Sequence, residues 1–336
     1  QSPVINATWQ DSWYDLTSGL EGEGEPTNAI QKVGYGNNDE QLGGPFQMDD
    51  REVFQVESEG NRYWRVETKD IYTGKGWVLS KSNPEIDGRG FFSTFGTEVK
   101  TREETATFEM ARELPFVPYN GDNVRVEVNQ QRQNVLVDPE NQKISYLDEA
   151  DRQRNYRIDY SYPLFTEEQL QTDEPVNLSE NETERYLQLP EGLPQRVRDL
   201  AEQIVEGEET PWDKARAIEN YFEEENFEYN TEDVAVPKEN QDYVDQFLFE
   251  TKLGYCDNFS TSATVLLRAA GLPARWVKGF TGGESDVIGA AVTSYTVRNK
   301  NAHSWVEVYI EGPGWVPLEP TVSFDGAGQY TIDRET

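Results

Sequence analysis

A thiol nucleophile paired with an imidazole base is the chemistry that the rarest residue types of this chain could perform. Cys256 and His303 are the single cysteine and the single histidine among 336 residues. Glu319 follows the histidine by 16 positions. One cysteine and one histidine cannot build a disulfide framework, and they are too few for a structural zinc site without carboxylate ligands. They suffice for a nucleophile and a base, with a carboxylate to orient the imidazole.

Cys256 stands at the predicted start of a helix. Gly254 allows the chain to turn tightly just before it, and Gly271 and Pro273 end the helical pattern. The apolar residues between them recur at helical spacing: Phe259, Ala263, Leu266, Leu267 and Ala270. Free N–H groups at a helix N-terminus stabilise a thiolate and can serve as oxyanion donors. On this stretch alone, a reactive thiol and a buried packing cysteine are equally good interpretations.

His303 falls on a predicted strand with two different faces. Residues 302–310 alternate, and successive side chains of a strand point to opposite sides of the sheet. One face would carry Ala302, Ser304, Val306, Val308 and Ile310, and the other His303, Trp305, Glu307 and Tyr309. The histidine is therefore expected to share its face with aromatic and acidic side chains.

A turn and a return strand follow, which predicts a β-hairpin. The turn occupies residues 311–314, and a hairpin centred on Glu311 would place Glu319 opposite His303. A carboxylate there would accept a hydrogen bond from one imidazole nitrogen and leave the other to face the thiol. A register shifted by one residue would make Glu307 the partner instead. The non-catalytic interpretation is that Glu319 is an exposed strand carboxylate and that the neighbouring His303 has no catalytic role.

The first half of the chain has the texture of antiparallel β structure. Short stretches rich in β-branched and aromatic residues alternate with turn signals, at 53–56, 63–68, 70–78, 105–110, 124–128, 134–137, 143–147 and 156–162. They predict a sandwich or an open barrel. Residues 1 to about 50 show little periodicity and are expected to be irregular. The carboxylates of this half lack the calcium-loop pattern, so no metal is assigned.

The second half of the chain reads as mixed helix and strand. A polar stretch at 166–185 leads into it, and helices are expected at 195–205, 211–225 and 242–251. Thr210 is the expected N-cap of the second of these helices. The cysteine helix and at least three strands come next. The predicted fold class is α+β, with a β-rich domain at 1–185 and a second domain at 186–336.

Composition limits the partners and the surroundings of the chain. The formal net charge is −33, which disfavours nucleic acid as a partner because phosphate binding needs clustered Lys and Arg. The acidity is spread along the sequence, which is typical of a solvated surface, with basic partners as the alternative. No run of 18 apolar residues occurs, so no transmembrane helix is predicted within this chain.

Three motifs in order carry a resemblance to a known family. They are Leu253–Cys256 with the helix that follows it and Ala269–Arg275, then Asn301–Val308, and then Gly314–Thr321. Together they resemble the transglutaminase-like superfamily of papain-type folds, over about residues 190–325. The resemblance is closest to the bacterial membrane-anchored TgpA type, in which an extracytoplasmic β-plus-transglutaminase region lies between transmembrane helices. It implies that this chain is an excised soluble fragment of such a region at the extracytoplasmic face of the bacterial cell membrane.

The resemblance also implies roles for three residues. Cys256 would be the nucleophile, His303 the general base and acid, and the third position, most often Asp in the family, is Glu319 here. Animal members place an oxyanion-donating tryptophan upstream, and the corresponding region of this chain has none; it contains Tyr221, Phe222 and Tyr229. Oxyanion stabilisation would fall to the Cys256 backbone N–H and a second donor that the sequence does not identify. No cofactor and no calcium dependence are expected.

The implied activity is thiol-dependent acyl transfer on the carboxamides of proteins or peptides. The acyl-enzyme would pass its acyl group to an amine acceptor or to water, and the sequence leaves this choice open. Two alternatives remain: a cysteine protease or amidase that acts on peptides or cell-wall stem peptides, and a non-catalytic binding ectodomain. Tyr255, Trp276 and Trp305 lie near the motifs and would either line a substrate tunnel or belong to the core.

Overall fold

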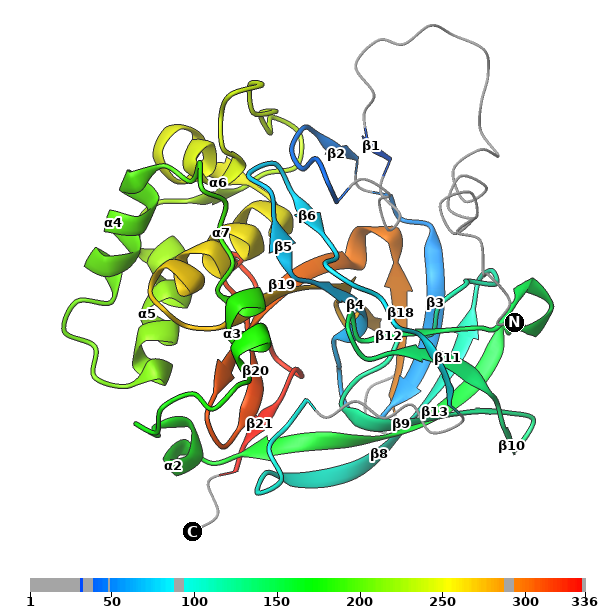
Figure 1. Ribbon diagram of the computed structural model, residues 1–336. Coiled ribbons are helices and arrows are strands. Elements are labelled where there is room, and N and C mark those ends of the chain that lie inside the picture. The colour runs from blue at the N-terminus through cyan, green and yellow to red at the C-terminus, as the bar shows by residue number, and fades with distance from the viewer. Residues whose placement is uncertain (1–30, 33–38, 48, 88–93, 287–292, 334–336) are drawn as a thin grey trace, which may run out of the picture.

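The computed structural model describes residues 31–32, 39–47, 49–87, 94–286 and 293–333. The helices gather on one side of the molecule and the long strands on the other (Figure 1). Together with the sheet pairings, this confirms the predicted α+β class. Most of the stretch expected to be irregular, residues 1–50, lies outside the described residues. A short parallel pair, β1 (Gln31–Lys32) and β2 (Phe46–Gln47), falls within it.

The larger sheet has eight strands, of which seven run in the order β10-β9-β13-β8-β3-β18-β17, while β21 pairs in parallel with β13. The other pairs are antiparallel. The strands are β3 (Glu52–Ser58), β8 (Lys100–Met110), β9 (Asp122–Val128), β10 (Gln131–Arg132), β13 (Asn155–Phe165), β17 (Glu284–Ser285), β18 (Thr293–Arg298) and β21 (Thr331–Ile332). From Glu104 onward, buried residues alternate with more exposed ones along β8, as they do when one face of a sheet packs on a core.

The smaller sheet holds four antiparallel strands in the order β20-β19-β16-β4. These are β4 (Trp64–Lys69), β16 (Ala274–Phe280), β19 (Ala302–Ile310) and β20 (Gly314–Leu318). Strand β4 comes from the first half of the chain, while β18 of the larger sheet comes from the second. Both sheets therefore contain strands from both sides of residue 185, and the division into two domains at that point stays a prediction.

The remaining strands form small sheets at the sides of these two. They are β5 (Ile71–Tyr72) with β6 (Trp77–Val78), β7 (Glu85–Asp87) and β12 (Lys143–Ser145) on either side of β11 (Val135–Asp138), and β14 (Glu228–Tyr229) with β15 (Leu253–Gly254). The last pair is parallel and runs directly into the cysteine helix. Because β15 ends at Gly254, this pair fixes the point at which the cysteine helix begins.

The helices lie almost entirely in the second half of the chain. They are α2 (Glu167–Leu170), α3 (Glu180–Tyr186), α4 (Gln195–Ile204), α5 (Pro211–Glu224), α6 (Tyr243–Gln246), α7 (Cys256–Ala269), the 3₁₀ turns η2 (Glu149–Asp151) and η4 (Asn299–Asn301), and the π-helical turn η3 (Phe247–Thr251). The predicted cap of α5 is confirmed, since the Thr210 hydroxyl accepts the backbone N–H of Asp213 at 3.1 Å. None of the helices described here is both long and apolar enough to span a lipid bilayer.

Helix α7 is the centre of the second half. It packs against α4 and α5 on one side and against β16 and β19 on the other (Figure 1). A helix covered on all sides must satisfy its polar groups internally. The hydroxyls of Ser260 and Thr264 do so by donating to the carbonyl oxygens of Cys256 and Ser260, each at 2.7 Å.

Candidate active site

Cys256 is the first residue of α7, as predicted. The side chain of Asn258 turns back to accept the backbone N–H of Tyr255 at 3.1 Å, which closes the first turn of the helix. Gly254 is needed for this, because a Cβ there would lie 2.4 Å from the Asn258 side chain. The Cys256 sulfur therefore lies at the helix end where backbone N–H groups are unpaired, a position that favours negative charge. The residue is 5 % exposed.

His303 lies near the start of β19, and its imidazole contacts both other predicted site residues. Nε2 lies 2.7 Å from Oε2 of Glu319, and the Cys256 side chain is close enough to the ring to raise its pKa. The sulfur also lies 3.8 Å from Oδ1 of Asp257. Since Nε2 is engaged by the carboxylate, Nδ1 is the nitrogen left for the sulfur. The three residues predicted from sequence are thus in one contiguous group, and all three are buried.

The hairpin that brings Glu319 to His303 has a different register from the predicted one. Strands β19 and β20 pair Val306 with Leu318 and Ile310 with Gly314, so the hairpin is centred on Gly312. The prediction that Glu319 lies directly opposite His303 is therefore wrong by two residues. A shift of two keeps every side chain on its own face of the sheet, and diagonal neighbours remain within reach of long side chains. The contact between Glu319 and His303 is therefore present despite the different register.

The alternative partner from sequence, Glu307, is engaged elsewhere. Its carboxylate forms ion pairs with Arg275, the residue across from it on β16, and with Arg65 on β4. The side chain is completely buried. Glu307 thus belongs to an ion-pair cluster between the strands, four residues further along β19 than His303.

The Glu319 carboxylate is held from three sides. Besides the imidazole, Oε2 accepts the hydroxyl of Tyr63 at 2.9 Å, and Oε1 accepts the backbone N–H of Thr321 at 3.1 Å. The backbone N–H of Glu319 itself donates to Oε1 of Glu219 on α5 at 2.7 Å. Burial raises the pKa of Glu219 to about 7. Tyr63 and Glu219 were missed in the sequence because both contacts join residues 100 or more positions apart.

A chain of hydroxyl groups ties the cysteine helix to the histidine strand. Ser304 donates to Oδ1 of Asp257 at 2.7 Å and lies 2.8 Å from the hydroxyl of Ser260. Trp276 in turn donates its indole N–H to Ser260 at 2.9 Å. These bonds fix the start of α7 against β19 and β16. They set the distance between the thiol and the imidazole.

The aromatic residues near the motifs belong mainly to the core. Trp276 is completely buried and stacks on Trp77 at 5.9 Å, and Tyr255 is 1 % exposed. Trp305, on the same side of β19 as His303, meets Tyr63 edge to face and lines a small pocket. Of the two interpretations from sequence, the core position therefore fits Tyr255 and Trp276.

The imidazole is covered by an aromatic side chain that the sequence did not reveal. The ring of Phe324 stacks on His303 with a centroid distance of 4.5 Å and also touches Tyr229 at 5.6 Å. Phe324 comes from the segment after β20. A substrate carbonyl that reaches the sulfur must therefore enter beside this ring or displace it.

His303 carries its proton across the neutral pH range. Burial alone would lower its pKa, but the charge of Glu319 and the hydrogen bonds to Cys256 and Glu319 raise the pKa of His303 from 6.5 to about 10. A histidine whose pKa is raised by folding adds stability that is fully present below pH 6.5. That stability is lost as the pH rises through about 10.

We expect the imidazole to remain doubly protonated at pH 8. The chain has one histidine, so selective ¹⁵N-histidine labelling gives one pair of ring signals that need no assignment. Their titration should have its midpoint near 10 rather than near the ordinary value of 6.5. A midpoint near 6.5 would mean that the imidazole is not paired with a charged carboxylate.

Comparison with known proteins identifies a matching family model and relatives in sequence. Residues 198–320 match the family model of the transglutaminase-like superfamily. The protein YebA of Bacillus subtilis (strain 168) is 41 % identical over 314 residues, which cover 89 % of this chain and 42 % of YebA. A protein-glutamine gamma-glutamyltransferase of Pseudomonas aeruginosa (strain PAO1) is 36 % identical over 137 residues, 41 % of this chain and 20 % of that enzyme. The chain thus spans less than half the length of either relative.

One solved structure matches the fold over most of the chain. The periplasmic domain of TgpA from Pseudomonas aeruginosa superposes with a TM-score of 0.59, covering 81 % of this chain and 88 % of that domain at 24 % identity. Because the match covers 81 % of the chain, it extends into both halves. The predicted arrangement, a β-rich region joined to a transglutaminase-like core, is confirmed at the level of the fold.

Proposed function

We propose, from the premise that this chain carries a transglutaminase-like domain in a fold of the TgpA type, that it is a thiol enzyme that transfers acyl groups from the carboxamides of proteins or peptides. The observation that carries the proposal is the contiguous group of Cys256, His303 and Glu319. Its imidazole lies 2.7 Å from a buried carboxylate and is close enough to the single thiol of the chain for the thiol to raise its pKa. These are the parts of a nucleophile, a base and an orienting group.

In the first step the Cys256 sulfur attacks the carbonyl carbon of the amide. The carbonyl oxygen gains negative charge at the N-terminus of α7, where the Cys256 backbone N–H can donate to it. His303 then gives its proton to the amide nitrogen as the C–N bond breaks, and ammonia or an amine leaves. Glu319 stabilises the imidazolium before this transfer and keeps Nδ1 directed at the sulfur.

In the second step an acceptor attacks the thioester. The neutral imidazole takes a proton from the acceptor, the new bond forms, and the thiolate leaves as the original ion pair is restored. An amine acceptor gives transamidation, and water gives hydrolysis. The Phe324 ring stacked on the imidazole supports the amine as acceptor, because an apolar cover disfavours water at the thioester.

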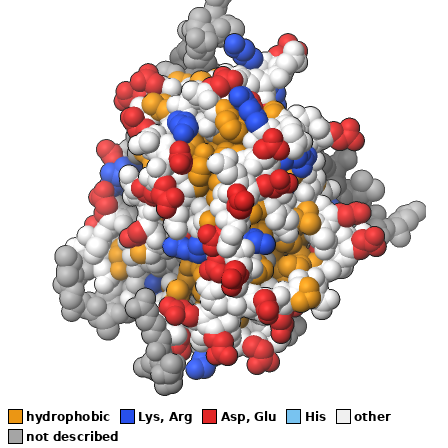
Figure 2. Space-filling view, turned by 90° about the vertical axis from the view of Figure 1, so that its left-hand side faces the viewer, with side chains coloured by type: hydrophobic (Ala, Val, Ile, Leu, Met, Phe, Trp, Pro, Cys, Tyr) orange, Lys and Arg blue, Asp and Glu red, His pale blue; other side chains and the backbone are white. Residues whose placement is uncertain are grey.

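The surface charge supports the same acceptor. Asp and Glu side chains are spread over the face in Figure 2, with few Lys and Arg between them, in keeping with the net charge of −33. Such a surface attracts cationic amines, including lysine side chains, and repels polyphosphates such as nucleic acids. The likeness to a periplasmic domain supports an activity on the extracytoplasmic side of a bacterial membrane.

The test is an amine-incorporation assay on the 336-residue chain. A glutamine-containing protein such as casein would be incubated with a fluorescent primary amine, and the products followed by gel fluorescence and by mass spectrometry. We expect covalent incorporation that is lost in His303→Ala. Ammonia release or peptide cleavage without incorporation would assign hydrolysis instead. No covalent change in any glutamine or peptide substrate would favour a binding ectodomain.

A further inference from the structure

The first half of the chain contributes a side chain to the candidate site. Tyr63 comes directly before β4, on the edge of the smaller sheet next to β16. Its hydroxyl donates to Oε2 of Glu319 at 2.9 Å, and this is the oxygen that faces His303 Nε2 at 2.7 Å. Two donors therefore share one carboxylate oxygen, and one of them is the proposed catalytic imidazole.

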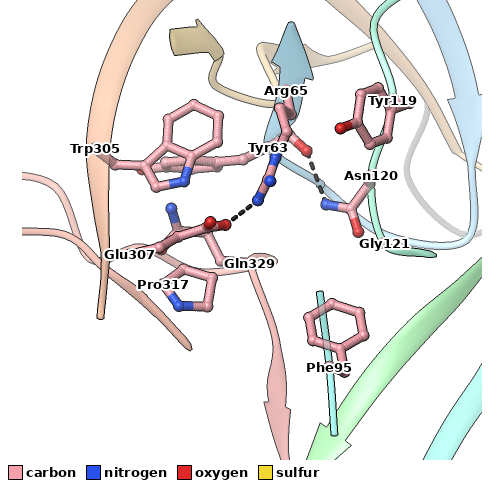
Figure 3. Close-up of a pocket in the computed structure, with 10 residues that line it drawn as sticks. All are labelled: Tyr63, Arg65, Phe95, Tyr119, Asn120, Gly121, Trp305, Glu307, Pro317 and Gln329. Carbon is pink, nitrogen blue, oxygen red and sulfur yellow. Dashed lines mark hydrogen bonds and ion pairs between the residues drawn. The ribbon is translucent and has the colours of Figure 1, made fainter. Parts of the chain in front are cut away.

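Tyr63 is itself held in place by contacts along its length. Asn120 donates to its backbone oxygen at 2.8 Å, the dashed line that joins these residues in Figure 3. Its ring meets those of His303 and Trp305 edge to face, at centroid distances of 5.6 and 5.4 Å. The residue is 6 % exposed. A side chain fixed at its backbone, its ring and its hydroxyl can hold a neighbour in one orientation.

The segment that carries Glu319 also packs against the chain near Tyr63. At Gly328, an added Cβ would lie 1.7 Å from the backbone oxygen of Asn61, so the two backbones are in direct contact. The hydroxyl of Tyr63 remains a donor throughout, because burial, and after it the charge of Glu319, raise the pKa of Tyr63. It therefore always competes with the imidazole for the charge of Oε2.

We propose that Tyr63 is a positioning residue of the site, which fixes the Glu319 carboxylate and takes up part of its charge so that His303 can release its proton. The proposal rests on the proposed function. Without the Tyr63 hydroxyl, the carboxylate charge falls more fully on the imidazolium, which then holds its proton more tightly. A stronger hold slows protonation of the leaving amine, while the contacts that bind the substrate are unaffected.

Other charged and titratable groups face this pair and stay constant in the test. They are Cys256 and Asp257 on α7, Glu219 on α5, Tyr229 on β14 and Asp325 after β20. None of them is changed when only the hydroxyl of Tyr63 is removed. Any shift seen in Tyr63→Phe therefore reports the one hydrogen bond that was deleted.

The experiment compares Tyr63→Phe with a matched control, Tyr160→Phe. Tyr160 is also a buried tyrosine whose hydroxyl donates to a buried carboxylate, that of Glu104 at 2.8 Å, in the larger sheet. In Tyr63→Phe we expect the ¹⁵N titration midpoint of His303 to rise by about 0.5 to 1 pH unit, as the loss of one hydrogen bond predicts. The kcat for amine incorporation should fall by roughly 3- to 10-fold with KM unchanged. Tyr160→Phe should have the wild-type values of both the His303 titration midpoint and the kcat.

A double substitution separates positioning from a general loss of structure. If Tyr63 acts through the carboxylate, adding Tyr63→Phe to a Glu319→Gln chain should not move the His303 titration further. A His303 titration that is unchanged or lowered in Tyr63→Phe, or an equal effect in the Glu319→Gln background, would overturn the proposal. The NMR titration needs no turnover, so a chain without amide chemistry would refute the proposed function while the role of Tyr63 is still measured.

Discussion

Cys256→Ala is expected to abolish amine incorporation, with kcat/KM lowered by about 10³-fold or more and the fold intact. The covalent route passes through the sulfur, and the chain has no second thiol to replace it. The substitution removes one atom from a residue that is 5 % exposed at the end of a helix, so packing changes little. Incorporation of the fluorescent amine measures the activity, and near-ultraviolet circular dichroism checks the fold.

Ser262→Ala is the matched control for this prediction. Ser262 lies on the same helix, is completely buried, and its hydroxyl has no hydrogen-bond partner among the described residues. Removing that hydroxyl should leave both activity and stability close to those of the wild type, because no bond is lost. Equal activity in Cys256→Ala and Ser262→Ala would contradict covalent catalysis by the sulfur.

Glu307→Ala is expected to lower the free energy of unfolding by about 3 to 5 kcal/mol, the usual cost of removing one partner from a buried ion pair. The carboxylate is completely buried between Arg275 and Arg65, and the substitution would leave two guanidinium groups without it. Figure 3 shows the Arg65 pair beside the pocket. Urea denaturation at pH 7 measures the change.

Glu109→Ala, at an exposed position of the larger sheet, is the control for Glu307→Ala. Glu109 lies on β8 with an exposed side chain, so Glu109→Ala should change the free energy of unfolding by no more than about 0.5 kcal/mol. If Glu307→Ala cost as little as Glu109→Ala, the buried ion-pair cluster would not stabilise the junction of β4, β16 and β19. At urea concentrations below its unfolding midpoint, the Glu307→Ala variant should show the same His303 titration midpoint as the wild type, because Glu307 does not contact the imidazole.

Local sequence patterns predicted the elements that carry the site. The period of Phe259, Ala263 and Leu266 placed the cysteine helix, and it begins at Cys256 as expected. Alternation predicted the two faces of β19, and the cap at Thr210 predicted the start of α5. Such signals are readable because they depend on residues within a few positions of one another.

Contacts between distant segments could not be read in the same way. The pairing of β4 with β16 brings Tyr63 to Glu319 across 256 positions, and no periodicity records such a meeting. Phe324 stacks on His303 from an irregular segment with no pattern of its own. The hairpin register differed by two residues because the turn occupies only residues 311–313, with Gly312 at its centre and at a φ of 89°. The predicted contact between Glu319 and His303 is nevertheless present, because a register shift of two residues leaves both side chains on the same face of the sheet.

The most direct measurement of the central claim is the rate of alkylation of Cys256 by iodoacetamide as a function of pH. Native chain and His303→Ala would be compared, with mass spectrometry of the single cysteine as the readout. A thiolate–imidazolium pair predicts fast labelling at neutral pH that is strongly slowed in the variant, because the thiolate is the reactive form. Labelling at the same rate with and without His303, at every pH, would contradict the pairing of Cys256 with the imidazole.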